Sequence, residues 1–107
     1  MAHGGEPWTQ ETFALMQQYP QLYMDISTIA WIGGAEGRAG FHGFLRHAIA
    51  LGLGTRIMFG TDQMAWPDAI GLAIEGVDSA EFLTAQQKRD IFYENAVRFL
   101  HLKEPLN

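Results

Sequence analysis

Hydrophobic and polar positions along the chain alternate between helical and extended spacing. Apolar side chains recur three residues apart between Phe13 and Tyr19, which predicts a helix over residues 9–19 with Thr9 as its N-cap. Pro20 ends that helix. Residues 22–27 are rich in strand-forming side chains and are followed by a glycine pair, so we expect a strand and then a loop.

The same order repeats in the next stretch. From Gly40, apolar residues at positions i, i+3, i+4, i+7 and i+8 predict a second helix, which ends at Gly52 and Gly54. Residues 57–59 are uniformly apolar, as in a parallel strand that is buried on both faces. A less regular stretch follows, with a short helix expected over residues 68–75.

The final helix is predicted over residues 85–101. Thr84 and Gln87 have the spacing of a capping box in front of it. Its expected buried residues are Ile91, Phe92, Ala96, Phe99 and Leu100. Helix, strand, helix, strand, helix is the order of a parallel α/β sheet, which carries ligand chemistry at the carboxyl ends of its strands.

Composition limits the classes of function. The chain has 107 residues and a net charge of −5, which fits one domain over residues 1–107 and offers no basic surface for nucleic acid or an anionic membrane. Without cysteine, any metal site needs His and carboxylate ligands. No apolar run is long enough for a membrane helix, and residues 1–10 lack the regions of a signal peptide, so we expect a cytoplasmic protein.

Asp62 is the first candidate for chemistry. It follows the apolar segment at residues 57–59, where the backbone leaves the sheet, and barrel enzymes keep catalytic carboxylates at such positions. An aspartate here can equally cap the loop that follows. Local sequence leaves both roles open.

His3 is the second candidate. Two glycines follow it and let the backbone turn sharply or pass close to a ligand, although a histidine so near the terminus can also have no function. The interval from His3 to Asp62 equals two helix–strand units of about 30 residues each, which places them on alternate strands. Alternate strands of a closed parallel barrel contribute to the same layer of side chains. The pair could therefore share a divalent metal that lowers the pKa of bound water.

The remaining histidines have plainer interpretations. His42 and His47 flank the apolar stripe of their helix and are expected at its solvent margin. His101 follows the last helix and favours its carboxyl end.

Glycine-rich and aromatic segments are weaker signals. The glycines at residues 52–54 fit a helix C-cap better than a dinucleotide fingerprint, because they close a helix. Residues 33–37 follow a strand but lack the spacing of a phosphate loop. Trp31, Met64 and Trp66 either line a pocket at the strand ends or fill the mouth of the core.

Four segments occur in an order typical of a known family: Ala2-His3-Gly4-Gly5, Tyr19-Pro20-Gln21-Leu22-Tyr23-Met24-Asp25, Arg56-Ile57-Met58-Phe59-Gly60-Thr61-Asp62 and Asn95-Ala96-Val97-Arg98-Phe99-Leu100. With these motifs the chain resembles the amidohydrolase-related family of metal-dependent hydrolases and decarboxylases, which are (β/α)₈ TIM barrels. The resemblance covers essentially the whole chain. It implies the carboxyl-terminal portion of such a barrel, its last two to three βα units.

The resemblance assigns roles to the two candidates. Asp62 would be the carboxylate after the last strand, which binds the catalytic divalent metal, usually zinc, and takes a proton from the bound water. His3 would be the sixth-strand histidine, which positions or deprotonates that water, polarises the substrate or ligates a second metal. Asn95 matches a recurrent asparagine of the terminal helix, and we expect it to be structural.

The resemblance also implies ligands that this sequence does not contain. The family's His-x-His pair on the first strand and its histidine on the fifth have no counterpart here, and a zinc site needs about three protein ligands. The sixth strand is reduced to Met1 and Ala2. We therefore expect the chain alone to hold zinc weakly or not at all and to be inactive by itself.

Assembly is expected for the same reason. A barrel of about 250 residues cannot close from this chain, so strand edges and apolar surface should be exposed. We expect a homo-oligomer or a complement of a missing N-terminal half.

Two functions remain open: a metal-dependent hydrolase that acts on a small-molecule substrate in the complete enzyme, or a non-catalytic truncated domain that self-associates. A phosphate-binding α/β module built on residues 33–37 rests on the weaker motif.

Overall fold

The computed structural model describes residues 1–103, so the last four residues of the domain expected over residues 1–107 lie outside the described residues. Its two strands, β1 (Met24–Asp25) and β2 (Ile57–Met58), pair in parallel. The helix α2 (Gly34–Ala50) connects them. This β–α–β unit confirms the predicted parallel α/β arrangement, although both strands are shorter than expected.

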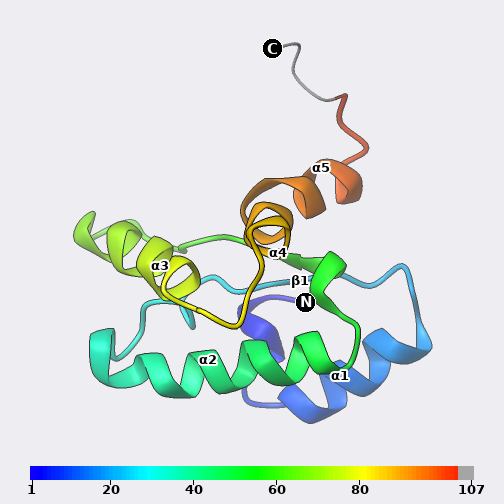
Figure 1. Cartoon of the computed structure of the whole chain (residues 1–107), viewed down its shortest axis with the longest axis horizontal. Coiled ribbons are helices and arrows are strands. Elements are labelled where there is room, and N and C mark those ends of the chain that lie inside the picture. Colours follow the sequence, from blue (N-terminus) through cyan, green and yellow to red (C-terminus); the bar gives the residue numbers. More distant parts are fainter. Residues whose placement is uncertain (104–107) are drawn as a thin grey trace.

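Helices surround the strand pair. In Figure 1 the strands run through the middle of the molecule, with α1 and α2 on one side and α4 and α5 on the other. Within residues 1–103, none of the helices combines the length and the apolar character needed to cross a membrane. Besides α2, the helical elements are η1 (His3–Gly5), α1 (Thr9–Gln18), η2 (Gly54–Arg56), α3 (Asp68–Asp78), α4 (Ala85–Arg89), η3 (Asp90–Glu94) and α5 (Asn95–Phe99), of which η1 and η2 are 3-10 turns and η3 is a π-helical turn.

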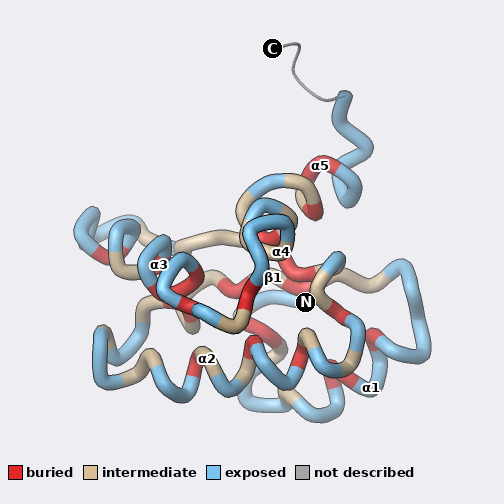
Figure 2. The backbone as a smooth tube through the Cα atoms, in the orientation of Figure 1, coloured by how far each residue is buried: buried red, intermediate tan, exposed pale blue. Residues whose placement is uncertain are grey.

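The hydrophobic core lies on one face of the strands. Met24, Ile26 and Ile57 are fully buried there and pack against apolar side chains of α1, α2, α3 and η3. Figure 2 shows this as red segments on the strands and on the inward sides of the helices. Met58, on the alternate face, is only half-buried. The prediction that residues 57–59 are buried on both faces is therefore wrong, because the second face borders an open depression.

Two predicted helix starts are corrected. The helix α2 begins at Gly34, six residues earlier than expected, because Gly33 adopts a left-handed φ of +81° that turns the chain into the helix. Gly37 then packs so closely on the Ile32 carbonyl that a Cβ would overlap it. Most of the predicted loop at residues 33–37 is thus helical. In α1 the N-cap position is held by Trp8 rather than Thr9, whose hydroxyl donates to Glu6.

The predicted caps around α2 and α4 are confirmed. Gly52 follows α2 with a φ of +79°, as the C-cap interpretation requires. At the start of α4, the Thr84 hydroxyl accepts from the Gln87 N–H at 3.0 Å, and the Gln87 side chain accepts from the Thr84 N–H at 2.9 Å.

The π-helical turn η3 closes the outer edge of β2. In η3 the Asn95 N–H reaches back five residues to the Asp90 carbonyl, which leaves the Ile91 carbonyl available. That carbonyl accepts from the Phe59 N–H at 2.9 Å. The buried Asn95 amide also donates to the carbonyls of Ile57 and Gly54, both at 2.8 Å. These bonds agree with the structural role expected for Asn95.

Met1 lies along the other edge of the strand pair. Its ammonium group donates to the Tyr23 carbonyl at 2.9 Å, and its carbonyl accepts from the Asp25 N–H at 2.9 Å. The expectation of two unprotected strand edges is therefore wrong at these positions, because backbone and amide groups of neighbouring segments already bond there.

Phe99 and Leu100 do not enter the core as predicted. Both are exposed, and both border the open depression beside Met58. The ring of Phe99 contacts that of Tyr23 at a centroid distance of 5.0 Å. Because η3 contains a wider turn, the residues after it are rotated relative to a regular α-helix, and these two side chains face the depression.

Candidate functional site

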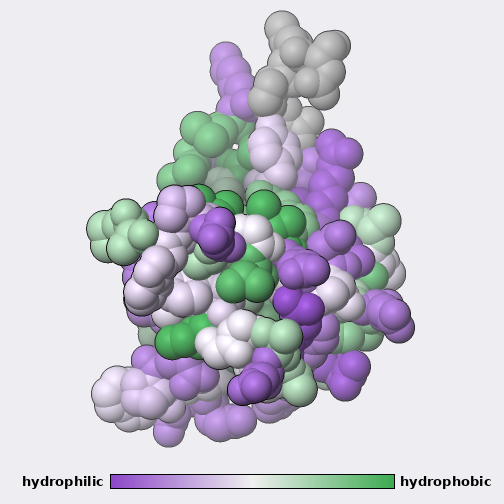
Figure 3. All heavy atoms as spheres, turned by 90° about the vertical axis from the view of Figure 1, so that its left-hand side faces the viewer, coloured by the Kyte–Doolittle hydropathy of each residue, from purple (hydrophilic) through white to green (hydrophobic). Residues whose placement is uncertain are grey.

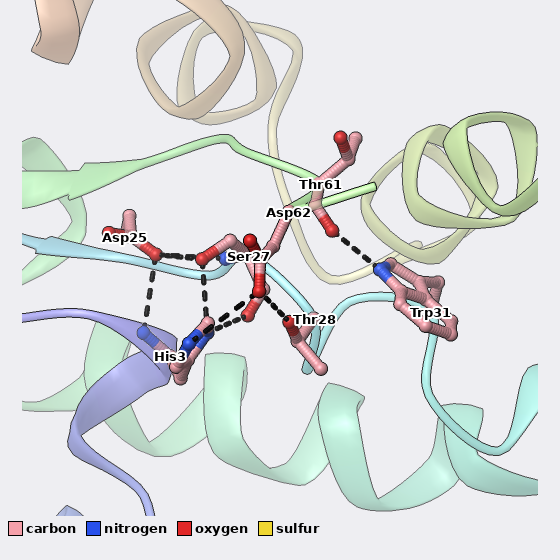
Figure 4. Close-up of polar contacts among 7 residues, drawn as sticks. All are labelled: His3, Asp25, Ser27, Thr28, Trp31, Thr61 and Asp62. Carbon is pink, nitrogen blue, oxygen red and sulfur yellow. Dashed lines mark hydrogen bonds and ion pairs between the residues drawn. The ribbon is translucent and has the colours of Figure 1, made fainter. Parts of the chain in front are cut away.

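The carboxyl ends of β1 and β2 meet the turn η1, and this junction brings the two predicted site residues together. His3 Nε2 lies 3.8 Å from Asp62 Oδ2. The two side chains are 44% and 50% exposed, so the pair is open to solvent and to small molecules. Figure 4 shows both side chains pointing toward each other from η1 and from the segment after β2.

The two glycines after His3 make its position possible. Gly4 is buried with a φ of +61°, and a Cβ there would lie 2.7 Å from side-chain atoms of Ile29 and Phe44. Gly5 has a φ of +78°, and a Cβ there would overlap the side chain of Thr12. The turn that presents His3 therefore requires glycine at both positions.

The His3 ring is held from β1 and the segment after it. Its Nδ1 lies 2.9 Å from the Ser27 carbonyl oxygen and 3.1 Å from Ser27 Oγ. Asp25 Oδ1 accepts from the His3 N–H at 3.2 Å, from the Ser27 N–H at 3.0 Å and from the Ser27 hydroxyl at 2.5 Å. One carboxylate oxygen thus fixes the backbone of His3 and the residue that contacts its imidazole (Figure 4).

Sequence reasoning missed Asp25 and Ser27. The available signal was their alternation on a predicted strand: in residues 24–27, the apolar Met24 and Ile26 alternate with two polar residues. In a parallel sheet, polar residues on one face near the carboxyl end point to the site rather than to the core.

Asp62 is held by the segment after β1. The Thr28 hydroxyl donates to Asp62 Oδ2 at 3.2 Å. The Trp31 indole donates to the carbonyl of Thr61, the residue before Asp62, at 2.7 Å. Trp31 thereby ties down the backbone that carries the carboxylate.

Backbone strain gathers at this junction. His3, Thr28 and Asp62 have φ values of +54°, +67° and +54°, in the left-handed region that favours glycine. A β-branched residue such as Thr28 is rare there, and strain of this kind costs about 1–3 kcal/mol per residue and clusters at functional sites. The strain supports a functional interpretation of the junction.

An aromatic depression adjoins Asp62. It has a volume of about 280 Å³, and Trp31, Met64 and Trp66 line it together with Thr28 and Asp62. The rings of Trp31 and Trp66 meet edge to face at 6.4 Å, and Met64 is 92% exposed. Trp31 therefore both lines a pocket and fills the mouth of the core, since it also packs against the hydrophobic core, whereas Met64 and Trp66 are exposed at the depression. Figure 3, which looks at the end of the molecule that carries α3, shows apolar side chains gathered at the centre of that face with polar ones around them.

The other histidines lie apart from the junction. His42 Nε2 bonds to the Gly76 carbonyl at 2.8 Å and ties α2 to α3. The exposed His47 places its ring edge-on to Phe13. Both positions fit the plain interpretations made from the sequence.

The junction supplies part of a metal site. Neutral imidazole nitrogen and carboxylate oxygen are suitable zinc ligands, and His3 and Asp62 present one of each. Among residues 1–103, no group of three or more His, Asp or Glu side chains could hold a metal ion. The donor types therefore fit a divalent metal, and the described residues provide two donors.

Comparison with known proteins gives one match. A family model described as amidohydrolase matches residues 1–102. No curated protein and no solved structure matches the chain.

Proposed function

Because the chain belongs to the amidohydrolase family, we propose that it is the carboxyl-terminal part of a metal-dependent hydrolase with a TIM-barrel fold, in which His3 and Asp62 act on a small-molecule substrate. The observation that carries the proposal is the 3.8 Å separation of His3 Nε2 and Asp62 Oδ2, which come from segments far apart in the sequence. In this proposal the β1–α2–β2 unit corresponds to the last strands of the barrel.

The two residues would hold a divalent metal, most suitably zinc. A bound metal of this kind lowers the pKa of a water molecule and so supplies a nucleophile. Asp62 accepts the Thr28 hydroxyl on Oδ2, which fixes the rotation of the carboxylate. When no metal occupies the position between the two side chains, the same Nε2 lone pair, 3.8 Å from Asp62 Oδ2, is placed to accept a proton from a polar group there. The aromatic depression beside Asp62 would receive the apolar part of a substrate.

Weak metal binding is expected of this chain alone, because residues 1–103 provide two donors and a zinc site needs about three. Further donors would come from an N-terminal half of the barrel or from another copy. We propose that such a partner covers the open face of the strands. The depression there has a volume of about 420 Å³, and Met58, Phe99 and Leu100 are among its lining residues.

Residue-specific zinc titration tests the proposed metal site. NMR signals of the four imidazole rings are followed in the full chain as Zn²⁺ is added. We expect the His3 signals to respond first and that response to be lost in Asp62→Asn. His47→Gln is the matched control, because it removes an exposed ring away from the junction. An unselective response of all four histidines, or an unchanged response in Asp62→Asn, would contradict the proposal.

A non-catalytic, self-associating domain is the second candidate, favoured by the apolar depression beside Met58. Sedimentation velocity over a range of concentrations distinguishes it. If association uses this face, Leu100→Glu should shift the distribution toward monomer, whereas Leu102→Glu, an exposed leucine that does not line the depression, should not. A concentration-independent monomer would rule out self-association.

A further inference from the structure

We infer that Asp25 and Ser27 are positioning residues that fix His3 as its Nδ1–H tautomer and aim the Nε2 lone pair at Asp62. The inference rests on the proposed role of His3 and Asp62, and it names the residues that prepare this pair for a cation or a water molecule.

The contacts of Nδ1 determine where the ring proton lies. The Ser27 carbonyl oxygen, 2.9 Å away, can only accept a hydrogen bond. The Ser27 hydroxyl gives its proton to Asp25 Oδ1 at 2.5 Å and therefore turns a lone pair toward Nδ1 at 3.1 Å. Both neighbours of Nδ1 are acceptors, so Nδ1 carries the proton.

A neutral imidazole has one ring proton, so Nε2 is then unprotonated. It faces Asp62 Oδ2 at 3.8 Å, and a carboxylate oxygen is also an acceptor. Two acceptors that face each other are stabilised by a group between them that both can bind: a divalent cation or a water molecule that donates to both. Histidines that ligate metals owe their tautomer to the same kind of bond from the other ring nitrogen.

Asp25 acts on this arrangement through Ser27 and through the backbone of His3. Its Oδ1 accepts three hydrogen bonds, and the two to Ser27 set the direction of the hydroxyl proton. Without that carboxylate, the Ser27 hydroxyl is free to donate to Nδ1. That bond competes with the bond from Nδ1–H to the Ser27 carbonyl, so a larger fraction of the rings carries the proton on Nε2, where Asp62 accepts it and the lone pair that a cation needs is occupied.

Histidine tautomers are measured directly by two-bond ¹H–¹⁵N NMR of the metal-free full chain at about pH 8.5, where an ordinary imidazole is neutral. In the unmodified protein we expect a pyrrole-type Nδ1 and a pyridine-type Nε2 for His3. His42 is an internal control: its Nε2 bonds to the Gly76 carbonyl and should be pyrrole-type. A His3 ring protonated on Nε2, or on both nitrogens, overturns the inference without recourse to any variant.

Variants separate positioning from mere structural support. We expect Asp25→Ala to raise the fraction of His3 protonated on Nε2, against the Ser27 carbonyl that still favours Nδ1–H, and Asp25→Asn to keep the parent fraction because its amide oxygen can accept in the same place. Asp78→Ala, which removes a carboxylate near Lys88 at 3.8 Å, is the control and should leave His3 unchanged. An unchanged tautomer in a folded Asp25→Ala, judged by an unaltered His42 pattern, overturns the role of Asp25.

A variant that keeps the carbonyl tests Ser27 separately. Ser27→Ala should retain the Nδ1–H tautomer but broaden the His3 signals, because the ring loses one of its two Nδ1 partners. Sharp, unshifted His3 signals would remove Ser27 Oγ from the proposal. The His3 tautomer is measured on metal-free protein, so the result does not depend on whether the chain binds zinc. Conversely, a His3 ring protonated on Nε2 overturns this inference but does not by itself exclude zinc binding.

Discussion

The two faces of the strand pair differ in role: one belongs to the hydrophobic core, and the other holds the candidate site. Met24, Ile26 and Ile57 face the helices and are fully buried. Asp25 and Ser27, which alternate with them, are half-buried and hold His3 by hydrogen bonds. A strand turns successive side chains to opposite faces, so a segment of four residues supplies both the core and the site.

The contrast shows where stability and function are separated in this chain. Burial of apolar area on the helix-facing side favours folding. The opposite side carries the left-handed backbone of His3, Thr28 and Asp62, which costs free energy. Substitutions on the helix-facing side should therefore mainly change the free energy of unfolding. Substitutions on the opposite side should mainly change the arrangement of His3 and Asp62 and their response to zinc.

The largest expected effect is on the helix-facing side. Ile57→Ala should lower the free energy of unfolding by about 2–5 kcal/mol, because it opens a cavity at a fully buried position. Urea denaturation followed by circular dichroism measures it. Met58→Ala, one residue further on the open face, is the control and should cost about 1 kcal/mol or less. Equal losses for the two would contradict the division between the faces.

Asn95→Ala should have the next largest effect, a loss of about 2–3 kcal/mol, because the carbonyls of Ile57 and Gly54 lose their donor in a buried setting. Thermal unfolding gives the value. Gln86→Ala removes an exposed amide that bonds to Asp90 and should change stability by about 0.5 kcal/mol at most. A neutral Asn95→Ala would mean that the edge of β2 is not held by this side chain.

Gly5→Ala should cost about 1–3 kcal/mol, since a Cβ at a φ of +78° is strained and overlaps Thr12. It should also displace His3 and change its NMR signals. Gly40→Ala in α2 meets open space and should stabilise by about 0.5–1 kcal/mol. A Gly5→Ala protein as stable as the parent would show that the turn η1 does not depend on glycine.

The smallest effect on stability, and the sharpest test of the comparison, is expected for Thr28→Gly. Glycine relieves the strain at a φ of +67° but adds backbone entropy to the unfolded chain, so the free energy of unfolding should change by about 0.5 kcal/mol or less. The His3 response to Zn²⁺ should weaken, because Asp62 loses the Thr28 hydroxyl. A large loss of stability would place Thr28 among the structural residues instead.

The order of the elements could be predicted because it depends on local periodicity and turn chemistry. The cap at Thr84 and the C-cap at Gly52 are encoded within a few residues and are confirmed. The start of α2 could not be predicted from apolar periodicity, because it depends on the left-handed conformation of Gly33 and on the close packing of Gly37 against the Ile32 carbonyl. Phe99 and Leu100 were predicted as buried because a regular helix was assumed, and η3 changes their direction.

The candidate site could be predicted only in outline. The interval between His3 and Asp62 indicated that they approach each other, and the structure places them 3.8 Å apart. The Asp25 carboxylate accepts from the His3 N–H, the Ser27 carbonyl contacts the imidazole, and the Thr28 hydroxyl donates to Asp62 from a residue with a left-handed φ. The alternation in residues 24–27 could have placed Asp25 and Ser27 on the face of the site, but it does not specify their partners, because those contacts arise when two distant segments fold together.

Because η3 is a π-helical turn, the count of residues within it, and not only their side chains, determines whether the Ile91 carbonyl is available to the sheet. Deleting one residue between Asp90 and Glu94 would favour an ordinary α-helix in which the Ile91 carbonyl bonds within its own helix. The Phe59 N–H would then lose its acceptor. In this chain a single codon in the last helix therefore decides whether the second strand keeps its lateral hydrogen bond.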